Sequence, residues 1–144
     1  MPVSQWVRNS AAFWREYLAG KPSDCWVYIE NVADEEPGPL MELVNEIEDP
    51  RISVCLDVGH ARANSPVPLC QWIEGLGPRI GHVHLHNNDG QRDSHWPLNR
   101  GVIDMAETLD SLARYAPNTT YTLECDPEES LAWLAEYRGR TDAR

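Results

Sequence analysis

Lysine is almost missing from this chain of 144 residues, since Lys21 is the only one. It precedes an expected strand instead of following one, so Schiff-base chemistry and a lysine clamp for phosphate are poorly supported. Long apolar runs are also missing: no stretch approaches the roughly 18 apolar residues of a membrane span. The chain start lacks the basic and then apolar pattern of a signal peptide. We therefore expect a cytoplasmic protein without a membrane segment.

Paired cysteines are the next absence. No Cys-x-x-Cys pair occurs, and three of the four cysteines lie in or beside apolar runs typical of strands. We expect the cysteines to be reduced, buried and small hydrophobic residues, namely Cys25, Cys55, Cys70 and Cys125.

Positive charge is scarce as well. The chain has 12 Lys and Arg against 23 Asp and Glu, a formal net charge of −11. Such a charge opposes docking on a phosphate backbone or an anionic membrane, so small solutes are better candidate partners than nucleic acid. With 42% hydrophobic residues, the chain is long enough for one packed domain, which we expect over residues 1–144.

Short β-branched runs alternate with amphipathic stretches of helical period. Four strands are expected, over residues 26–31, 52–58, 80–87 and 121–125. Five helices lie before, between and after them, and their start signals are Ser4, Pro39, Pro68, Asp104 with Glu107, and Asp126-Pro127 with Glu129. A leading helix in residues 1–20 and four βα units in residues 25–139 predict an α/β fold with a parallel sheet.

Histidine is concentrated in one part of the chain, because all five histidines fall between residues 60 and 95. His82, His84 and His86 alternate along one expected strand and so share one of its faces. The other strands each carry one carboxylate on their polar face near the carboxyl end, where βα folds build active sites. These are Glu30, Asp57 and Glu124. One residue from each of four strands therefore predicts a divalent metal site.

Five segments resemble the xylose isomerase-like TIM-barrel superfamily, which includes sugar-phosphate isomerases and epimerases and the endonuclease IV type of DNA repair enzyme. The segments are Ile29-Glu30-Asn31, Asp57-Val58-Gly59-His60, His82-Val83-His84-Leu85-His86-Asn87-Asn88-Asp89-Gly90, Arg92-Asp93-Ser94-His95-Trp96-Pro97-Leu98 with Gly101, and Leu123-Glu124. They follow one another in the family's order, and the resemblance covers the chain from Cys25 onward.

The resemblance to the isomerase and epimerase branch implies one catalytic cation, held by Glu30, Asp57, His84 and Glu124. Three carboxylates and one imidazole suit Mn²⁺, Mg²⁺ or Co²⁺ and also admit Zn²⁺. Glu30 and Glu124 would act as base and acid in moving a proton next to a metal-bound carbonyl, and His60 would orient the substrate. The implied reaction is isomerisation or epimerisation of a sugar or sugar phosphate.

The resemblance to the endonuclease IV branch implies that His60, Asp93 and His95 hold a second metal ion. The segment before His60 contains no histidine, so a third zinc of a phosphodiesterase cluster lacks visible ligands. The acidic charge also disfavours DNA. We therefore rank a zinc phosphodiesterase below sugar chemistry.

Each candidate also has a plain structural interpretation. Glu30 and Glu124 could pair with an arginine, and Asp57 could cap a turn. Asp93 and His95 could be a solvated pair on a loop. His82 is expected to be a hydrogen-bonded interior residue, while His86 is expected at the mouth of the site. Contacts with substrate are expected from His86, Trp96 and Arg100.

The number of strands does not match a whole barrel. A (β/α)₈ barrel needs about 200 residues or more, and this chain has four expected strands, which match the carboxyl-terminal half. A half-barrel exposes strand edges, so we expect a homo-oligomer or a partner chain that completes the barrel. A fragment of a longer protein or an inactive remnant would also have only four strands. A non-enzymatic metal-binding half-domain therefore stands beside the isomerase as an alternative function.

Overall fold

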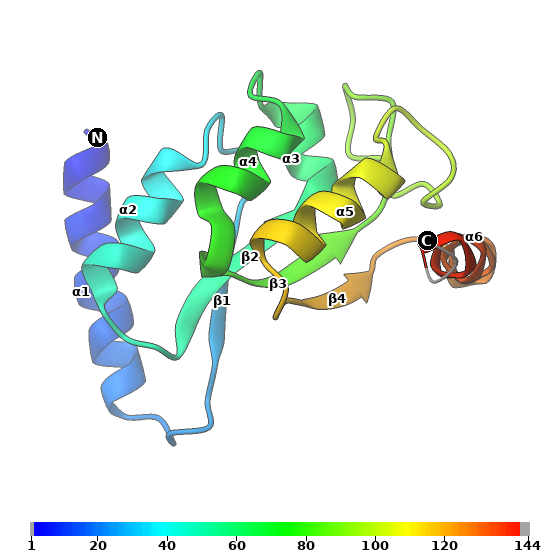
Figure 1. Cartoon of the computed structure of the whole chain (residues 1–144). Helices are drawn as coiled ribbons and strands as arrows, with labels where there is room; N and C mark the ends of the chain where they lie inside the picture. Colours follow the sequence, from blue (N-terminus) through cyan, green and yellow to red (C-terminus); the bar gives the residue numbers. More distant parts are fainter. Residues whose placement is uncertain (1, 142–144) are drawn as a thin grey trace.

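A computed structural model describes residues 2–141 of the chain. Its centre is one parallel sheet of four strands in the order β1-β2-β3-β4 (Figure 1). The strands are β1 Val27–Glu30, β2 Ile52–Asp57, β3 Ile80–Leu85 and β4 Thr120–Leu123. The sheet neighbours follow chain order, as in a (β/α)₈ barrel, so the predicted α/β class and half-barrel are confirmed.

Six α-helices accompany the strands in the described part of the chain, where five were expected. They are α1 Val3–Ala19, α2 Gly38–Ile47, α3 Val58–Asn64, α4 Leu69–Leu76, α5 Met105–Tyr115 and α6 Pro127–Thr141, with a 3₁₀ turn η1 at Gly77–Arg79. The helix missed was α3, which follows β2 without a linker. Its seven residues are too short for a periodic pattern, and Asp57 both ends the strand and caps the helix.

Two of the predicted acidic caps form at the helix starts. The Asp104 carboxylate accepts a hydrogen bond from the backbone N–H of Glu107 at 3.0 Å, and Asp126 accepts one from Glu128 at 3.0 Å. The expected Ser4 cap is wrong, because α1 begins at Val3 and makes no side-chain capping bond. The Pro2 carbonyl instead receives the N–H groups of Gln5 and Trp6.

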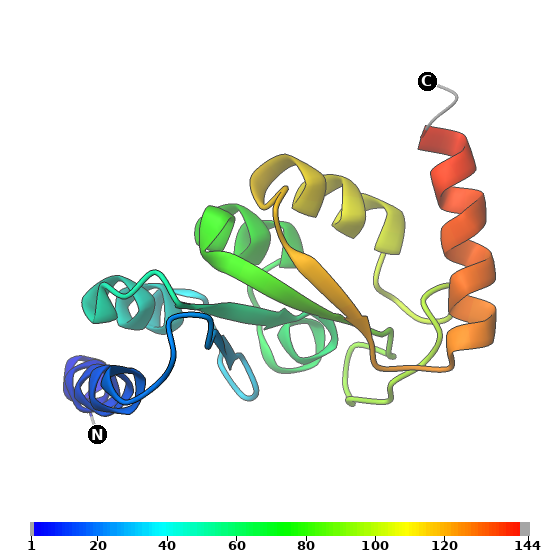
Figure 2. The same ribbon diagram turned by 90° about the horizontal axis from the view of Figure 1, so that it is seen from below.

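The core lies between the sheet and the helices on one side of it (Figure 1). The apolar residues of the central strands β2 and β3 on this side are buried, among them Val54, Leu56 and Val83 at 0% exposure, whereas Ile29 of β1 and Leu123 of β4 are half-buried. They pack against Trp72, Leu76 and Leu112 of α4 and α5, together with further residues of the same cluster. Helix α6 stands apart at the β4 end, with its axis turned away from those of α4 and α5 (Figure 2).

Two of the four strands, β1 and β4, are edge strands in the described chain. Trp26, just before β1, is 55% exposed, and Tyr28, in β1, is 40% exposed. Exposed aromatic side chains beside an unpaired strand are what a half-barrel leaves uncovered. In the described part of the chain, no helix has both the length and the apolar character needed to cross a membrane.

All four cysteines are free, as predicted, but their expected burial is only partly right. Cys55 is buried, and burial together with the nearby carboxylates of Glu30, Asp57 and Glu124 raises the pKa of its thiol to about 12. Such a thiol is inert near neutral pH. Cys70 is exposed in the first turn of α4, and Cys25 and Cys125 are half-buried.

Candidate metal centre

The four residues predicted to share one cation come together at the carboxyl ends of the strands. His84 Nδ1 lies 3.3 Å from Glu30 Oε1, 3.7 Å from Asp57 Oδ2 and 3.3 Å from Glu124 Oε1. Parallel pairing causes this convergence, since Asp57 is opposite His84 in the β2–β3 register. Glu30 ends β1, and Glu124 follows β4 directly. Three carboxylates from three strands therefore surround one imidazole nitrogen of the fourth.

Electrostatics favour a charged Asp57 at this point. Its side chain is fully buried, which would raise the pKa of the carboxyl. Hydrogen bonds from the His86 ring and the His60 backbone N–H, with the charges of those histidines, outweigh burial and lower the pKa. A buried carboxylate that stays ionised is suited to hold a cation.

The ion pairs recorded for Glu30 and Glu124 in the described residues are with histidines, and not with an arginine. The ion pairs of Glu30 in the described residues are with His60 and His84, and those of Glu124 are with His84 and His95. Both carboxylates are about one-third exposed, at 33% and 32% of the side chain. They therefore remain open to a ligand that enters from the mouth of the sheet.

Asn31 is a further residue of the site, and no role for it was predicted from the sequence. Its buried side chain bridges the ends of β1 and β2: Nδ2 donates to the Asp57 carbonyl at 3.0 Å, and Oδ1 accepts from the Asp57 N–H at 2.8 Å. Its own carbonyl lies 2.9 Å from His60 Nδ1. Asn31 therefore positions both Asp57 and His60. Its place directly after Glu30 was the only signal in the sequence.

A second cluster lies beside the first and contains His60, Asp93 and His95, as predicted. Asp93 Oδ2 lies 3.1 Å from His60 Nε2 and 2.9 Å from His95 Nε2. Burial alone would lower the pKa of both histidines. For His60 the charge of Asp57, the Asn31 carbonyl and Asp93 together outweigh burial, and for His95 the Glu124 carbonyl, Asp93 and the charge of Glu124 do so, and both pKa values are therefore raised. Whether this cluster binds a metal stays a prediction.

The remaining histidines occupy different environments. His82 lies 2.7 Å from Thr120 Oγ1 and 2.9 Å from Thr122 Oγ1, as expected for a hydrogen-bonded interior residue. The expected place of His86 at the mouth is wrong, because its ring is 0% exposed. It follows the last residue of β3, and its Nε2 lies 2.9 and 3.1 Å from the two oxygens of Asp57. Its contact with a substrate stays a prediction.

Trp96 and Arg100 lie on the long segment between β3 and α5. The Trp96 backbone pairs with that of Asn87 through two hydrogen bonds of 2.8 Å, and its side chain is 40% exposed. Arg100 Nε donates to Glu129 Oε1 of α6 at 2.9 Å. The predicted substrate contacts of both residues remain untested.

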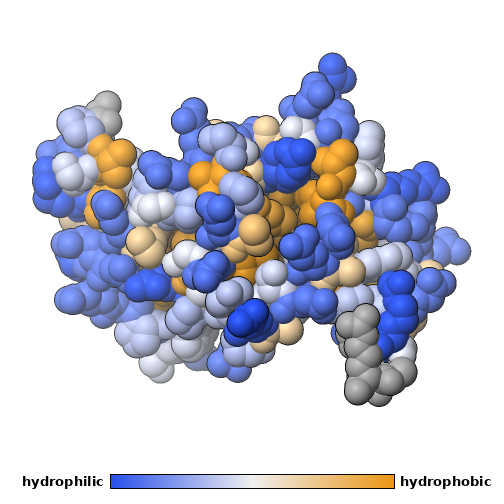
Figure 3. All heavy atoms as spheres, turned by 45° about the horizontal axis from the view of Figure 1, so that its top comes forward, coloured by the Kyte–Doolittle hydropathy of each residue, from blue (hydrophilic) through white to orange (hydrophobic). Residues whose placement is uncertain are grey.

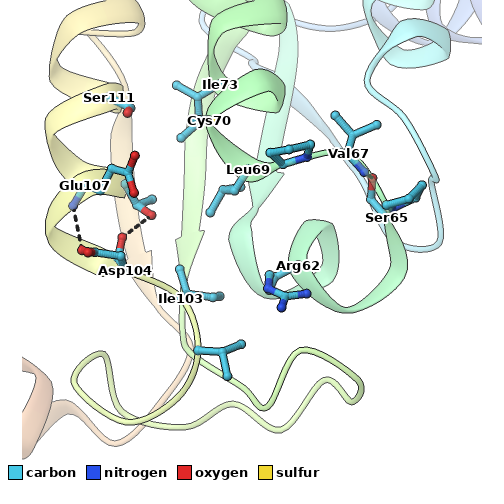
Figure 4. Close-up of a pocket in the computed structure, with 14 residues that line it drawn as sticks. Arg62, Ser65, Val67, Leu69, Cys70, Ile73, Ile103, Asp104, Glu107 and Ser111 are labelled. Atoms are coloured by element: carbon cyan, nitrogen blue, oxygen red, sulfur yellow. Dashed lines mark hydrogen bonds between the residues drawn. The ribbon is translucent and has the colours of Figure 1, made fainter.

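A cleft of about 370 Å³ lies elsewhere, between α3, α4 and the start of α5 (Figure 4). Hydrophobic side chains gather in a hollow of the otherwise mainly hydrophilic face in Figure 3, and the cleft lining includes Val67, Leu69 and Val102. Its Asp104 carboxylate is used to cap α5 (Figure 4). The convergent ionisable groups therefore lie at the strand ends and not in this cleft.

The sequence also matches a family of known proteins. Residues 10–137 match the family described as "Xylose isomerase-like TIM barrel". The chain belongs to this family.

Several solved structures are similar. A D-tagatose 3-epimerase-like protein has a TM-score of 0.77 and 23% identity, with 98% of this chain and 57% of that chain covered. A Thermus thermophilus protein, TTHB071, soaked with ZnCl2, has a TM-score of 0.72 and 26% identity, and the match covers 97% of this chain and 57% of that chain. An L-ribulose 3-epimerase has a TM-score of 0.67 and 18% identity, and the match covers 94% of this chain and 46% of that chain.

A curated relative shows the same partial coverage. The uncharacterized protein MJ1311 of Methanocaldococcus jannaschii is 30% identical over 89 residues, which are 61% of this chain and 30% of that protein. The chain thus spans about half the length of the similar solved structures and less of this relative.

Proposed function

We propose that this chain carries the metal-binding half of a sugar or sugar-phosphate isomerase or epimerase that depends on a divalent cation. The observation that carries the proposal is the convergence of Glu30, Asp57 and Glu124 on one nitrogen of His84. The family and the sugar epimerases among the similar structures support the same class of reaction.

The donor set fits a hard divalent cation. It offers several carboxylate oxygens and one imidazole nitrogen, and the ligand atoms of Glu30, Asp57 and His84 lie within 4.8 Å of one another. Mn²⁺, Mg²⁺ and Co²⁺ suit such a site, and Zn²⁺ is compatible with it. When bound, the cation would polarise a substrate carbonyl and hydroxyl, which acidifies the neighbouring C–H bond.

Two carboxylates are then available for the proton transfer. Glu30 and Glu124 come from the outer strands β1 and β4, so they approach a bound sugar from opposite sides. One takes the proton from the carbon next to the carbonyl, and the other returns a proton, to the opposite face for epimerisation or to the neighbouring carbon for isomerisation. His60 hydrogen-bonds to the substrate and orients it.

A second half completes the active site in this proposal. The open edges of β1 and β4 and the exposed Trp26 and Tyr28 are the surfaces that it would cover. It comes from a copy of this chain or from a partner chain. The same open surfaces favour the alternative function, a non-enzymatic metal-binding half-domain. A zinc phosphodiesterase ranks lower, because the net charge of −11 opposes binding to a phosphate backbone.

Elemental analysis combined with size-exclusion chromatography and light scattering tests the proposal. After dialysis against Mn²⁺, we expect a metal-bearing compact dimer, or a complex with a co-purifying partner chain. A metal-bearing monomer would favour the non-enzymatic half-domain. A metal-free monomer would contradict both, because the strand-end carboxylates would then hold no cation.

A further inference from the structure

The two open edges of the sheet differ in the helix that accompanies each of them. Helix α1 lies beside α2 at the β1 end, and α6 stands at the β4 end, so these two helices are at opposite ends of the molecule (Figures 1 and 2). Trp14 of α1 and both Val27 and Ile29 of β1 pack against one hydrophobic cluster. Any strand that pairs with the free edge of β1 would therefore have its helix-facing side next to α1.

Helix α1 has an aromatic flank on the side of this open edge. On its other flank, the Arg15 guanidinium donates to the backbone carbonyls of Glu46 and Ile47, and this fixes the side that faces α2. Phe13 and Tyr17 are about one helical turn apart, and the helical period places them across the buried stripe from Arg15. Their side chains are 58% and 41% exposed. The two rings therefore point away from α2 and toward the free edge of β1.

A groove of about 420 Å³ lies beside β4 at the other end of the sheet. Its lining includes Leu85, Tyr121 and Leu123 from the helix-facing side of the sheet, and Leu109 of α5 and Leu131 of α6. Tyr121 and Leu131 are 45% and 56% exposed. In a βα barrel, helices cover this side of every strand. Because α6 stands apart from α5, the helix-facing side of β4 is open (Figure 2).

The two ends of the molecule also differ in charge. Residues 3–21, which contain α1 and the turn after it, carry three basic side chains and one acidic side chain. Residues 105–141, which contain α5, β4 and α6, carry seven acidic and three basic side chains. Opposite charges favour a contact between unlike ends, whereas contacts between like ends would bring like charges together.

We propose that a second copy of this chain completes the barrel, with its β1 paired to β4 and its α1 seated in the groove between α5 and α6. Phe13 and Tyr17 of the second copy would fill the groove. The same contact, made twice around a twofold axis, closes a ring of eight parallel strands with all carboxyl ends at one mouth. This inference rests on the proposed function and deepens it, because it names the chain that completes the site.

Disulfide trapping tests this contact. Phe13→Cys and Leu131→Cys are made separately in a Cys70→Ser background, which removes the exposed native thiol, and the two proteins are mixed with a mild oxidant. Since α1 and α6 lie at opposite ends of one molecule, a bond between these positions joins two copies (Figures 1 and 2). We expect a covalent dimer from the mixture and none from either variant alone. Ala12→Cys, at an exposed position of α1 beside Phe13, is the matched control and should not cross-link to Leu131→Cys.

Sedimentation velocity gives an independent measure of the same contact. Phe13→Asp and Leu131→Asp should each raise the dissociation constant of the dimer about 10-fold or more, because a charge replaces an apolar anchor of the interface. Both side chains are more than half exposed in the single chain, so their replacement should leave its fold intact. Ala12→Asp adds the same charge to α1 outside the aromatic flank and should dissociate like the wild type.

Mn²⁺ titration of the same proteins separates this proposal from the function proposed above. A wild-type chain that binds Mn²⁺ but stays monomeric would overturn the second copy, leave its two surfaces to another chain and retain the metal centre. A covalent dimer from Phe13→Cys alone would also overturn the proposal, because like ends would then meet. Loss of Mn²⁺ binding in a dimer that still cross-links as expected would instead contradict the metal centre and support the assembly.

Discussion

Glu124→Gln is expected to abolish proton exchange between solvent and a ketose substrate. Removal of a general acid or base typically costs about 10²- to 10⁴-fold in rate, and glutamine can neither take nor give the proton. Glu124 Oε1 lies 3.3 Å from His84 Nδ1, so the carboxylate is next to the proposed cation position. The amide retains the shape of the side chain, which limits damage to the fold.

Deuterium incorporation measures this effect directly. The metal-loaded, assembled protein is incubated with ketoses in D2O, and proton NMR follows the loss of the signal next to the carbonyl. Glu128→Gln is the matched control, since Glu128 is an exposed residue in the first turn of α6. It should exchange like the wild type. Retained exchange in Glu124→Gln would remove Glu124 from the catalytic role.

His84→Gln is expected to lower the affinity for Mn²⁺ by about 100-fold or more, because it removes the nitrogen on which three carboxylates converge. Loss of a residue that merely supports a ligand already costs about 10- to 100-fold. Calorimetric titration with Mn²⁺ measures the change.

His82→Gln provides the comparison on the same strand. His82 shares a face of β3 with His84, but its ring nitrogens are taken up by Thr120 and Thr122. It should keep Mn²⁺ affinity near that of the wild type. Equal losses in the two variants would mean that the effect comes from disturbed packing of β3 and not from a lost ligand.

Strand periodicity placed Glu30, Asp57 and Glu124 on one face of the expected sheet together with three histidines, and the common direction of parallel strands placed them at one edge. The family resemblance, and not periodicity, then selected His84 from His82, His84 and His86. The same rule failed for His86, because β3 ends at Leu85 and alternation has no meaning beyond that point. The chain turns inward there, where the Asn87 backbone pairs with Trp96.

Other features depended on contacts that no local pattern reveals. Asn31 links two strand ends through bonds to a residue 26 positions away. The buried pocket for the His86 ring depends on the missing Cβ of Gly59. Helix α3 is defined by the Asp57 cap and by packing, since seven residues alone make a marginal helix. These are tertiary effects, and they surround candidate ligands that the sequence already indicated.

Anomalous X-ray diffraction from a crystal of the Mn²⁺-loaded protein tests the central claim most directly. We predict a manganese peak among Glu30, Asp57, His84 and Glu124, at the carboxyl ends of the four strands. A structure at saturating Mn²⁺ with no anomalous peak among these four side chains would contradict the proposed metal centre.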